Sequence, residues 1–330
     1  MRHIKHISII IVILILGLRA RGQQDPLYSQ YMFNLFLINP AYAGSEGYTS
    51  VNLVTRKQWL DFPGSPVTFS VSAQSRILKN SFIAKALSLR KKFSKRSSSG
   101  RVGVGIHVYR DMTGPISRTG VELNYAYHIP LRQSQLSFGL GLKNYNFHVD
   151  KSMLFSGPIT DPFILNNNFN RFVIDGNFGA QFTTPLLYTG LSVSNLFQSN
   201  INFGDKTSYP GLLTGRSYWL IGGYKVEINR LIMLEPSSLI KFTEHGAFQI
   251  DLTSRIYYRE DYWGGLSYRT GASGGSIILL LGMRVNKYYF GYAFDYTMAP
   301  IMTHTLGSHE FMFSVKFGEN ARRYRWLNRY

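Results

Sequence analysis

The sequence predicts an all-β fold, a transmembrane antiparallel β-barrel of about 14 strands. Three observations indicate it. Of the 330 residues, 15% are aromatic and only 16% are charged, whereas about a quarter of the residues of a soluble domain carry a charge. Many stretches alternate large apolar side chains with glycine or small polar ones, the two-residue period of a strand with two unlike faces. Beyond residue 22, no apolar run approaches the roughly 18 residues of a membrane-spanning helix.

The first 22 residues are typical of a secretory signal peptide. The start is basic, residues 7–18 form an apolar core, and Ala20 and Gly22 are the small residues before the expected cleavage point. An uncleaved anchor is the alternative. The chain has no cysteine, which excludes disulfides, cysteine-based zinc sites and thiol nucleophiles.

Residues 23–46 are expected to form an N-terminal periplasmic or plug segment. Its large apolar side chains follow helical spacing until Pro40 ends the run, and they are Tyr28, Tyr31, Met32, Leu35 and Phe36. Because a barrel of 14 strands is wider than the kind whose lumen is filled by its own side chains, this short helix has two possible places. It either plugs the lumen or packs on the periplasmic rim.

Residues 47–318 are expected to form the barrel. The alternating stretches and the turn residues between them give the following strands: 47–58, 65–76, 101–110, 118–129, 135–147, 171–183, 186–194, 216–228, 231–243, 246–258, 262–270, 275–285, 288–297 and 309–318. Most of these lengths suit a tilted membrane-crossing strand of about 9–11 residues.

The stretch YYFGYAFDY, residues 288–296, shows the alternation most clearly. Its even positions are all aromatic, and its odd positions after Tyr289 are Gly291, Ala293 and Asp295. Rings on one face suit contact with lipid, while small and polar residues suit the lumen. The side chains predicted to face lipid in the last two strands are Tyr288, Phe290, Tyr292, Phe294, Tyr296, Phe311, Phe313 and Phe317.

The turns predict an orientation. An even strand count returns the chain to its starting side, and bacterial barrels place tight turns in the periplasm. We therefore expect both termini and the short turns 130–135, 183–187, 229–230, 259–261 and 286–287 to be periplasmic. The longer connections 148–170 and 195–215 are then extracellular.

One long connection falls on the periplasmic side. Residues 79–96 carry seven Lys or Arg and no acid, and helical spacing separates an apolar arc from an arc with Lys85, Lys91, Lys92, Lys95 and Arg96. We expect a basic amphipathic helix at the periplasmic face, the alternative being a solvated loop.

The tail, residues 319–330, is basic and aromatic and contains Arg322, Arg323, Arg325, Trp326 and Arg329. Arginine with aromatic rings is enriched at protein interfaces, so the tail and the helix are expected to dock a partner. Adhesion to anionic lipid is the competing idea.

Two motifs resemble the PorP/SprF family of type IX secretion outer-membrane proteins. The first runs from residue 24 to 44 and has its matching positions at Gln24, Asp25, Pro26, Tyr28, Ser29, Gln30, Tyr31, Asn34, Asn39, Pro40, Ala41, Tyr42, Ala43 and Gly44. The second has its matching positions at Arg56, Gln58, Trp59, Gly64, Pro66 and Thr68. The stretches 102–117 and 309–317 look like the family's third and closing strands, so the resemblance covers nearly the whole mature chain.

The resemblance implies an outer-membrane barrel of Bacteroidota-type bacteria. Members of the family belong to the core secretion machine or serve particular secreted adhesins, including gliding adhesins with a carboxy-terminal sorting domain. The implied periplasmic partners are the ring of the machine and a peptidoglycan-binding lipoprotein. A passive or substrate-selective diffusion channel is the alternative function, which an open, conducting lumen would favour.

No constellation of residues in the sequence predicts an enzyme, a metal site or a cofactor. His304 and His309 lie near the last extracellular turn but cannot share one strand face. His107 and His128 are expected to point inward near Glu122, as polar residues of the lumen rather than as parts of a catalytic triad. The basic balance of the chain, a formal net charge of +18, favours anionic lipid or an acidic partner over nucleic acid in an exported protein.

Overall fold

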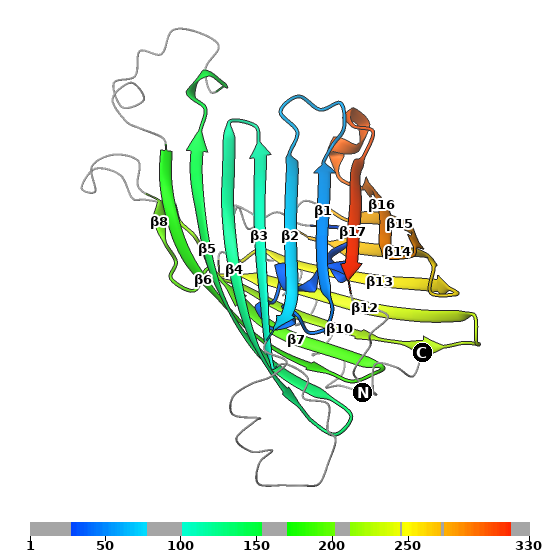
Figure 1. The fold of residues 1–330 in the computed structure, drawn as a ribbon. Coiled ribbons are helices and arrows are strands. Elements are labelled where there is room, and N and C mark those ends of the chain that lie inside the picture. Colours follow the sequence, from blue (N-terminus) through cyan, green and yellow to red (C-terminus); the bar gives the residue numbers. More distant parts are fainter. Residues whose placement is uncertain are drawn as a thin grey trace, which may run out of the picture.

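The computed structural model describes residues 28–77, 101–153, 170–201, 212–244, 246–271 and 274–317, and in them the chain forms a closed antiparallel barrel of fourteen strands (Figure 1). The barrel strands are β1 (Thr49–Lys57), β2 (Val67–Ile77), β3 (Val102–Thr113), β4 (Ile116–Pro130), β5 (Gln135–Val149), β6 (Asn170–Thr183), β7 (Leu187–Ser194), β10 (Ser217–Tyr224), β12 (Ile232–Thr243), β13 (Phe248–Tyr258), β14 (Tyr262–Thr270), β15 (Ser276–Val285), β16 (Tyr288–Thr297) and β17 (Ser308–Phe317). The predicted fold class is confirmed.

Two pairings close the sheet. The first strand, β1, pairs with the last, β17, from Thr49 opposite Phe317 to Lys57 opposite His309. On the far side β10 pairs with both β7 and β12. The short strand β11 (Val226–Glu227) extends the pairing of β12, and β8 (Asn200–Ile201) pairs with β9 (Leu212–Leu213) outside the barrel sheet.

The two ends of the barrel differ. At one end, which we call the turn end, the connections 131–134, 184–186, 225–231, 259–261 and 286–287 are short, and β1 begins and β17 ends there. At the other, the loop end, lie the described connections 58–66 and 298–307, together with the tight turn 114–115 between β3 and β4. The tight turns predicted for one side of the membrane therefore share one end of the barrel.

The two faces of the wall differ as the alternation predicts. On β16, Tyr288, Phe290 and Tyr296 are 38%, 42% and 45% exposed on the outer surface, whereas Ala293 and Asp295 are buried inside. Phe311 and Phe317 on β17 are also exposed. Tyr292, Phe294 and Phe313 are half-buried, because they pack against neighbouring rings such as His309 and Phe290.

Residues 28–45 lie inside the barrel, where they contact strands on opposite sides of the wall (Figure 1). We call them the plug segment. In place of the single helix that the spacing predicts, they form three 3₁₀ turns: η1 (Tyr31–Phe33), η2 (Leu35–Leu37) and η3 (Pro40–Tyr42). The helix is interrupted because Asn34 has φ −146° and ψ 55° and because Asn39 is extended, with Pro40 after it. These residues bury apolar side chains, among them Tyr31, Met32 and Phe36.

Four predicted features lie outside the described residues: the signal peptide at 1–22, the first positions of the family motif at Gln24 to Pro26, the basic helix at 79–96 and the tail at 319–330. Two short 3₁₀ turns complete the secondary structure, η4 (Lys151–Met153) and η5 (Pro300–His304). In the part of the chain that the structure describes, no helix combines the length and the apolar character needed to cross a membrane.

Candidate functional site

The inner wall carries glycines where the plug segment touches it. A Cβ atom on Gly103 would lie 1.8 Å from the carbonyl oxygen of Ala43, and one on Gly139 would lie 2.2 Å from the backbone nitrogen of Ala41. On Gly179 it would lie 2.0 Å from Oδ1 of Asn39. Real Cβ atoms do not approach other atoms so closely, so the glycines on the inner face leave the space that the plug segment occupies.

Asn39 holds the plug segment to the wall. Its Nδ2 donates hydrogen bonds to the carbonyl oxygens of Ala180 on β6 and Leu191 on β7, both at 3.0 Å. Its Oδ1 accepts a hydrogen bond from the backbone N–H of Ala41 at 2.9 Å and so caps η3. All the polar atoms of this fully buried side chain are thereby satisfied, which joins the plug segment to two strands of the barrel.

A buried carboxylate on β17 holds the beginning of the plug segment. The side chain of Glu310 is fully buried and accepts hydrogen bonds from the backbone N–H groups of Ser29 and Gln30 at 2.7 and 2.8 Å. Oγ of Ser29 donates to Asp295 on β16 at 2.8 Å. Arg56 on β1 joins these groups, because its guanidinium contacts Asp295 at 2.6 Å, Glu310 at 3.2 Å and Oγ of Ser29.

Two more ion pairs join neighbouring strands on the inner face of the wall, Asp251 with Arg269 and Glu235 with Arg255. Arg269 donates to Asp251 at 2.8 Å and to the carbonyl oxygen of Tyr28 at 3.4 Å. Nearer the turn end, Arg255 pairs with Glu235 at 2.5 Å, and the Tyr188 hydroxyl donates to the same carboxylate at 3.0 Å. Because a buried charge is costly unless it is paired, these pairs hold neighbouring strands of the wall together, and Arg269 also contacts the plug segment through Tyr28.

The remaining positions of the first motif make further contacts between the plug segment and the wall. Nδ2 of Asn34 donates to Oγ of Ser72 at 2.7 Å, and the carbonyl oxygen of Ala43 lies 2.9 Å from Nε2 of His128. Gly44 has φ 65°, and a Cβ atom there would lie 2.6 Å from the carbonyl oxygen of Ser75. In the described residues, Tyr28, Tyr31, Pro40, Ala41 and Tyr42 are buried in the interior.

The second motif forms the end of β1 and the loop after it. The backbone N–H of Gln58 donates to the carbonyl oxygen of Pro66 at 2.9 Å, and Gly64 has φ 69°. Trp59, with the unusual φ of 47°, donates its backbone N–H to Oγ of Ser308. Arg56 of this motif binds Ser29 of the first motif, so the two sequence patterns meet in space.

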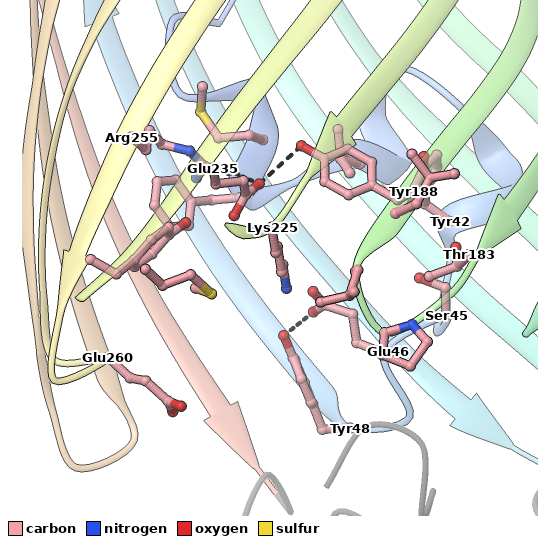
Figure 2. A pocket seen from close by; sticks show the side chains of 18 of the residues that line it. Tyr42, Ser45, Glu46, Tyr48, Thr183, Tyr188, Lys225, Glu235, Arg255 and Glu260 are labelled. Carbon is pink, nitrogen blue, oxygen red and sulfur yellow. Dashed lines mark hydrogen bonds and ion pairs between the residues drawn. The ribbon is translucent and has the colours of Figure 1, made fainter. Parts of the chain in front are cut away.

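A cavity of about 280 Å³ opens at the turn end beneath the plug segment. Figure 2 shows Glu235, Arg255 and Tyr188 in contact on its wall, with Lys225 pointing into the space and Glu46 and Tyr48 at the mouth. Met32, Leu35 and Phe36 of the plug segment also line it. A second cavity of about 230 Å³ at the loop end is lined by Arg56, Trp59 and Arg269 among others.

The histidines are located on the inner face of the barrel and in its loops. His107 contacts Oγ of Ser70 at 2.9 Å and lies 3.9 Å from Glu122, and His128 is fully buried against Ser137. His304 is exposed in η5, while His309 contacts the Tyr292 hydroxyl at 2.8 Å. Among the described residues, no group of three or more His, Asp or Glu side chains could hold a metal ion.

Sequence reasoning did not single out Asp295, Glu310, Arg269, Asp251, Glu235 or Arg255 as site residues. Their common signal is a charged residue on the small, polar face of a strand that is otherwise apolar. The predicted docking residues Lys85, Lys91, Lys92, Lys95, Arg96, Arg322, Arg323, Arg325, Trp326 and Arg329 lie outside the described part of the chain.

The comparisons with known proteins give one family. The family model PorP_SprF, described as type IX secretion system membrane protein PorP/SprF, matches residues 20–315. No curated protein matches the sequence.

Several solved structures resemble the barrel. The Acinetobacter baumannii outer membrane protein Omp33 is 8% identical, with 83% of this chain and 99% of that one covered and a TM-score of 0.44. A Pseudomonas aeruginosa FadL homologue is 10% identical, with 90% and 95% covered and a TM-score of 0.44. A mutant of the monoaromatic hydrocarbon channel TodX is 10% identical, with 86% and 92% covered and a TM-score of 0.41.

Proposed function

Because the chain belongs to the PorP/SprF family of type IX secretion system membrane proteins, we propose that it is a non-enzymatic component with a closed lumen that attaches secreted proteins to the machine. The family and the barrel place it in the outer membrane in a secretion-related role. Within that role, we propose that it supports the export or surface display of adhesins, including adhesins used in gliding.

The position of the plug segment supports a role in attaching secreted proteins rather than a role as a conducting channel. Its backbone lies against glycines of β3, β5 and β6, and buried carboxylates of β16 and β17 hold its first residues. A chain passing through the lumen would have to displace these contacts. The protein therefore works with the lumen filled, and cargo binds to its surfaces and ends.

The proposed orientation puts the turn end and both termini in the periplasm, and the outer rings of β16 and β17 against lipid. The basic segment 79–96 joins the barrel at the turn end, as does the tail, because β2 and β17 both end there. We assign the docking of periplasmic partners, the ring of the machine or a peptidoglycan-binding lipoprotein, to these two basic elements.

Locking the plug segment tests the attachment role. The side chains of Asn34 and Ser72 are in hydrogen-bond contact, and the natural chain has no cysteine, so Asn34→Cys with Ser72→Cys can be bridged by a disulfide formed with a mild oxidant. Export and display of cargo should continue at normal levels with the plug bridged. If bridging stops export while both single variants remain active, the lumen is a conduit and the proposal is wrong.

Truncation after Gly318 tests the docking role. The shortened chain should remain in the outer membrane but lose co-purification of its periplasmic partner and adhesin display. Charge reversal at Arg322, Arg323, Arg325 and Arg329 with the rings retained is the matched variant, which separates protein docking from attraction to anionic lipid. Normal partner recovery and display after truncation would exclude the tail as a docking element.

A further inference from the structure

The turn-end cavity contains hydrogen-bond donors that no described residue uses. Nζ of Lys225 points into the space in Figure 2 and makes no hydrogen bond with any described residue. Arg255 and Trp263 also line the cavity, but Nε of Arg255 and Nε1 of Trp263 are themselves inaccessible, so Lys225 is the donor that a ligand in the cavity can reach. An unused ammonium group calls for a ligand that supplies acceptors, such as carboxylate or carbonyl oxygens.

Part of the wall of this cavity is apolar and aromatic, beside the charged groups. Phe33 and Phe36 of the plug segment form part of its lining together with Tyr257, Trp263 and Tyr289 of the wall. The volume of about 280 Å³ lies just below the range of small-molecule sites, roughly 300–1,000 Å³. It therefore suits one large side chain with its neighbouring backbone rather than a folded domain.

Positive charge surrounds the mouth. Among the described residues at the turn end that are exposed or half-buried, eight are Lys or Arg and four are acids. The cations are Arg101, Arg132, Lys225, Arg230, Arg259, Arg284, Lys287 and Lys316, and the acids are Glu46, Glu227, Glu260 and Asp261. The connection 79–96, joined to the same end, adds seven cations and no acid to the sequence there. The excess attracts a negatively charged partner toward the cavity.

We propose that the turn-end cavity binds an acidic peptide segment of a partner protein, which inserts one aromatic or large apolar side chain between the rings and places a carboxylate on Lys225. The inference rests on the proposed attachment function and names the chemistry of the partner. A peptide fits better than a lipid headgroup, because the continuously paired wall separates the cavity from the surrounding bilayer. A soluble segment reaches it directly through the mouth.

Peptide binding to the full chain in phosphatidylcholine nanodiscs tests this inference. The probe is a short fluorescein-labelled peptide in which one phenylalanine is flanked by glutamates, followed by fluorescence anisotropy. Lys225→Glu should weaken binding roughly tenfold or more, since it replaces a charge-assisted contact with a repulsive one. Arg132→Glu, an equal charge change at the same end but outside the cavity, should change the affinity less than about threefold.

A second variant tests the apolar part. Met233 lines the cavity, and Met233→Trp fills it without changing the charge, so it should also abolish most of the binding. Replacing the phenylalanine of the probe by serine should do the same. Heat-modifiable migration in detergent gels verifies that each variant is a folded barrel.

Several outcomes would overturn the inference. Equal weakening by Lys225→Glu and Arg132→Glu would mean diffuse attraction to the whole end of the barrel. Binding that appears only after truncation at Gly318 would mean that the tail fills the cavity, and displacement of the probe by phosphatidylglycerol vesicles would indicate a headgroup site. None of these results depends on the experiment in which the plug segment is bridged to β2, so the peptide-binding inference and the attachment proposal can fail separately.

Discussion

Removal of Arg56 should be among the most damaging single changes in the barrel. Its guanidinium lies 2.6 Å from Asp295 and 3.2 Å from Glu310, and the three side chains are nearly inaccessible, at 4%, 4% and 0% exposure. Arg56→Met leaves two buried carboxylates, with Nη1 of Arg269 at 3.7 Å from Asp295 as the remaining cation near that carboxylate. Breaking a buried pair in this way costs about 3–5 kcal/mol.

Urea unfolding in lipid vesicles, followed by tryptophan fluorescence, measures this cost. The matched control is Arg216→Met, because Arg216 pairs with Glu244 at a similar 3.2 Å but with side chains that are 37% and 27% exposed. An exposed pair contributes little because water screens it, so Arg216→Met should cost much less than Arg56→Met. Arg56→Met combined with Asp295→Asn and Glu310→Gln should recover stability to within about 2 kcal/mol of the natural chain, since no buried charge is then left unpaired. Equal losses for Arg56→Met and Arg216→Met, or no recovery in the triple variant, would refute the reasoning.

Three further changes test the wall and the plug segment. Asn39→Ala removes two hydrogen bonds to β6 and β7 carbonyls and should cost about 1–3 kcal/mol in the same unfolding assay; a loss below about 0.5 kcal/mol would contradict its anchoring role. Gly139→Val would clash with the backbone of Ala41 and push the plug segment off the wall, so a Tyr42→Cys reporter should then react with a water-soluble maleimide. The control Gly222→Ala, whose added Cβ has its nearest neighbour 3.9 Å away, should leave the reporter protected. Phe290→Arg on the outer face should cost about 2–4 kcal/mol in lipid and Ala293→Ser on the inner face little, so that equal tolerance of both would argue against the proposed lipid facing.

The strands were predictable because the period of two is carried by residues close together in the sequence. The stretch 288–297 was predicted with the bounds that β16 has, and its large residues alternate with Gly291, Ala293 and Asp295 on the inner face. The predicted strand 216–228 is divided in the structure into β10 and β11, with Lys225 between them turning into the cavity.

The position of the plug segment could not be decided from the sequence. Its apolar spacing suits a rim as well as a lumen, and the residues that hold it are distant in the chain: Arg56 and Asp295 are 239 positions apart. The glycines at 103, 139 and 179 form one surface only when β3 to β6 pair in their observed register. The helical pattern was misleading for a local reason, since Asn34 and Asn39 interrupt it with non-helical backbone and use their side chains to bind the wall.

Single-channel conductance in planar bilayers tests the closed lumen most directly. The full chain should conduct little. Deletion of residues 25–38 removes η1, η2 and the contacts to Glu310, and it should raise the conductance while the shortened protein still migrates as a folded one. High conductance of the full chain that the deletion leaves unchanged would contradict a plugged lumen and would identify the protein as a diffusion channel.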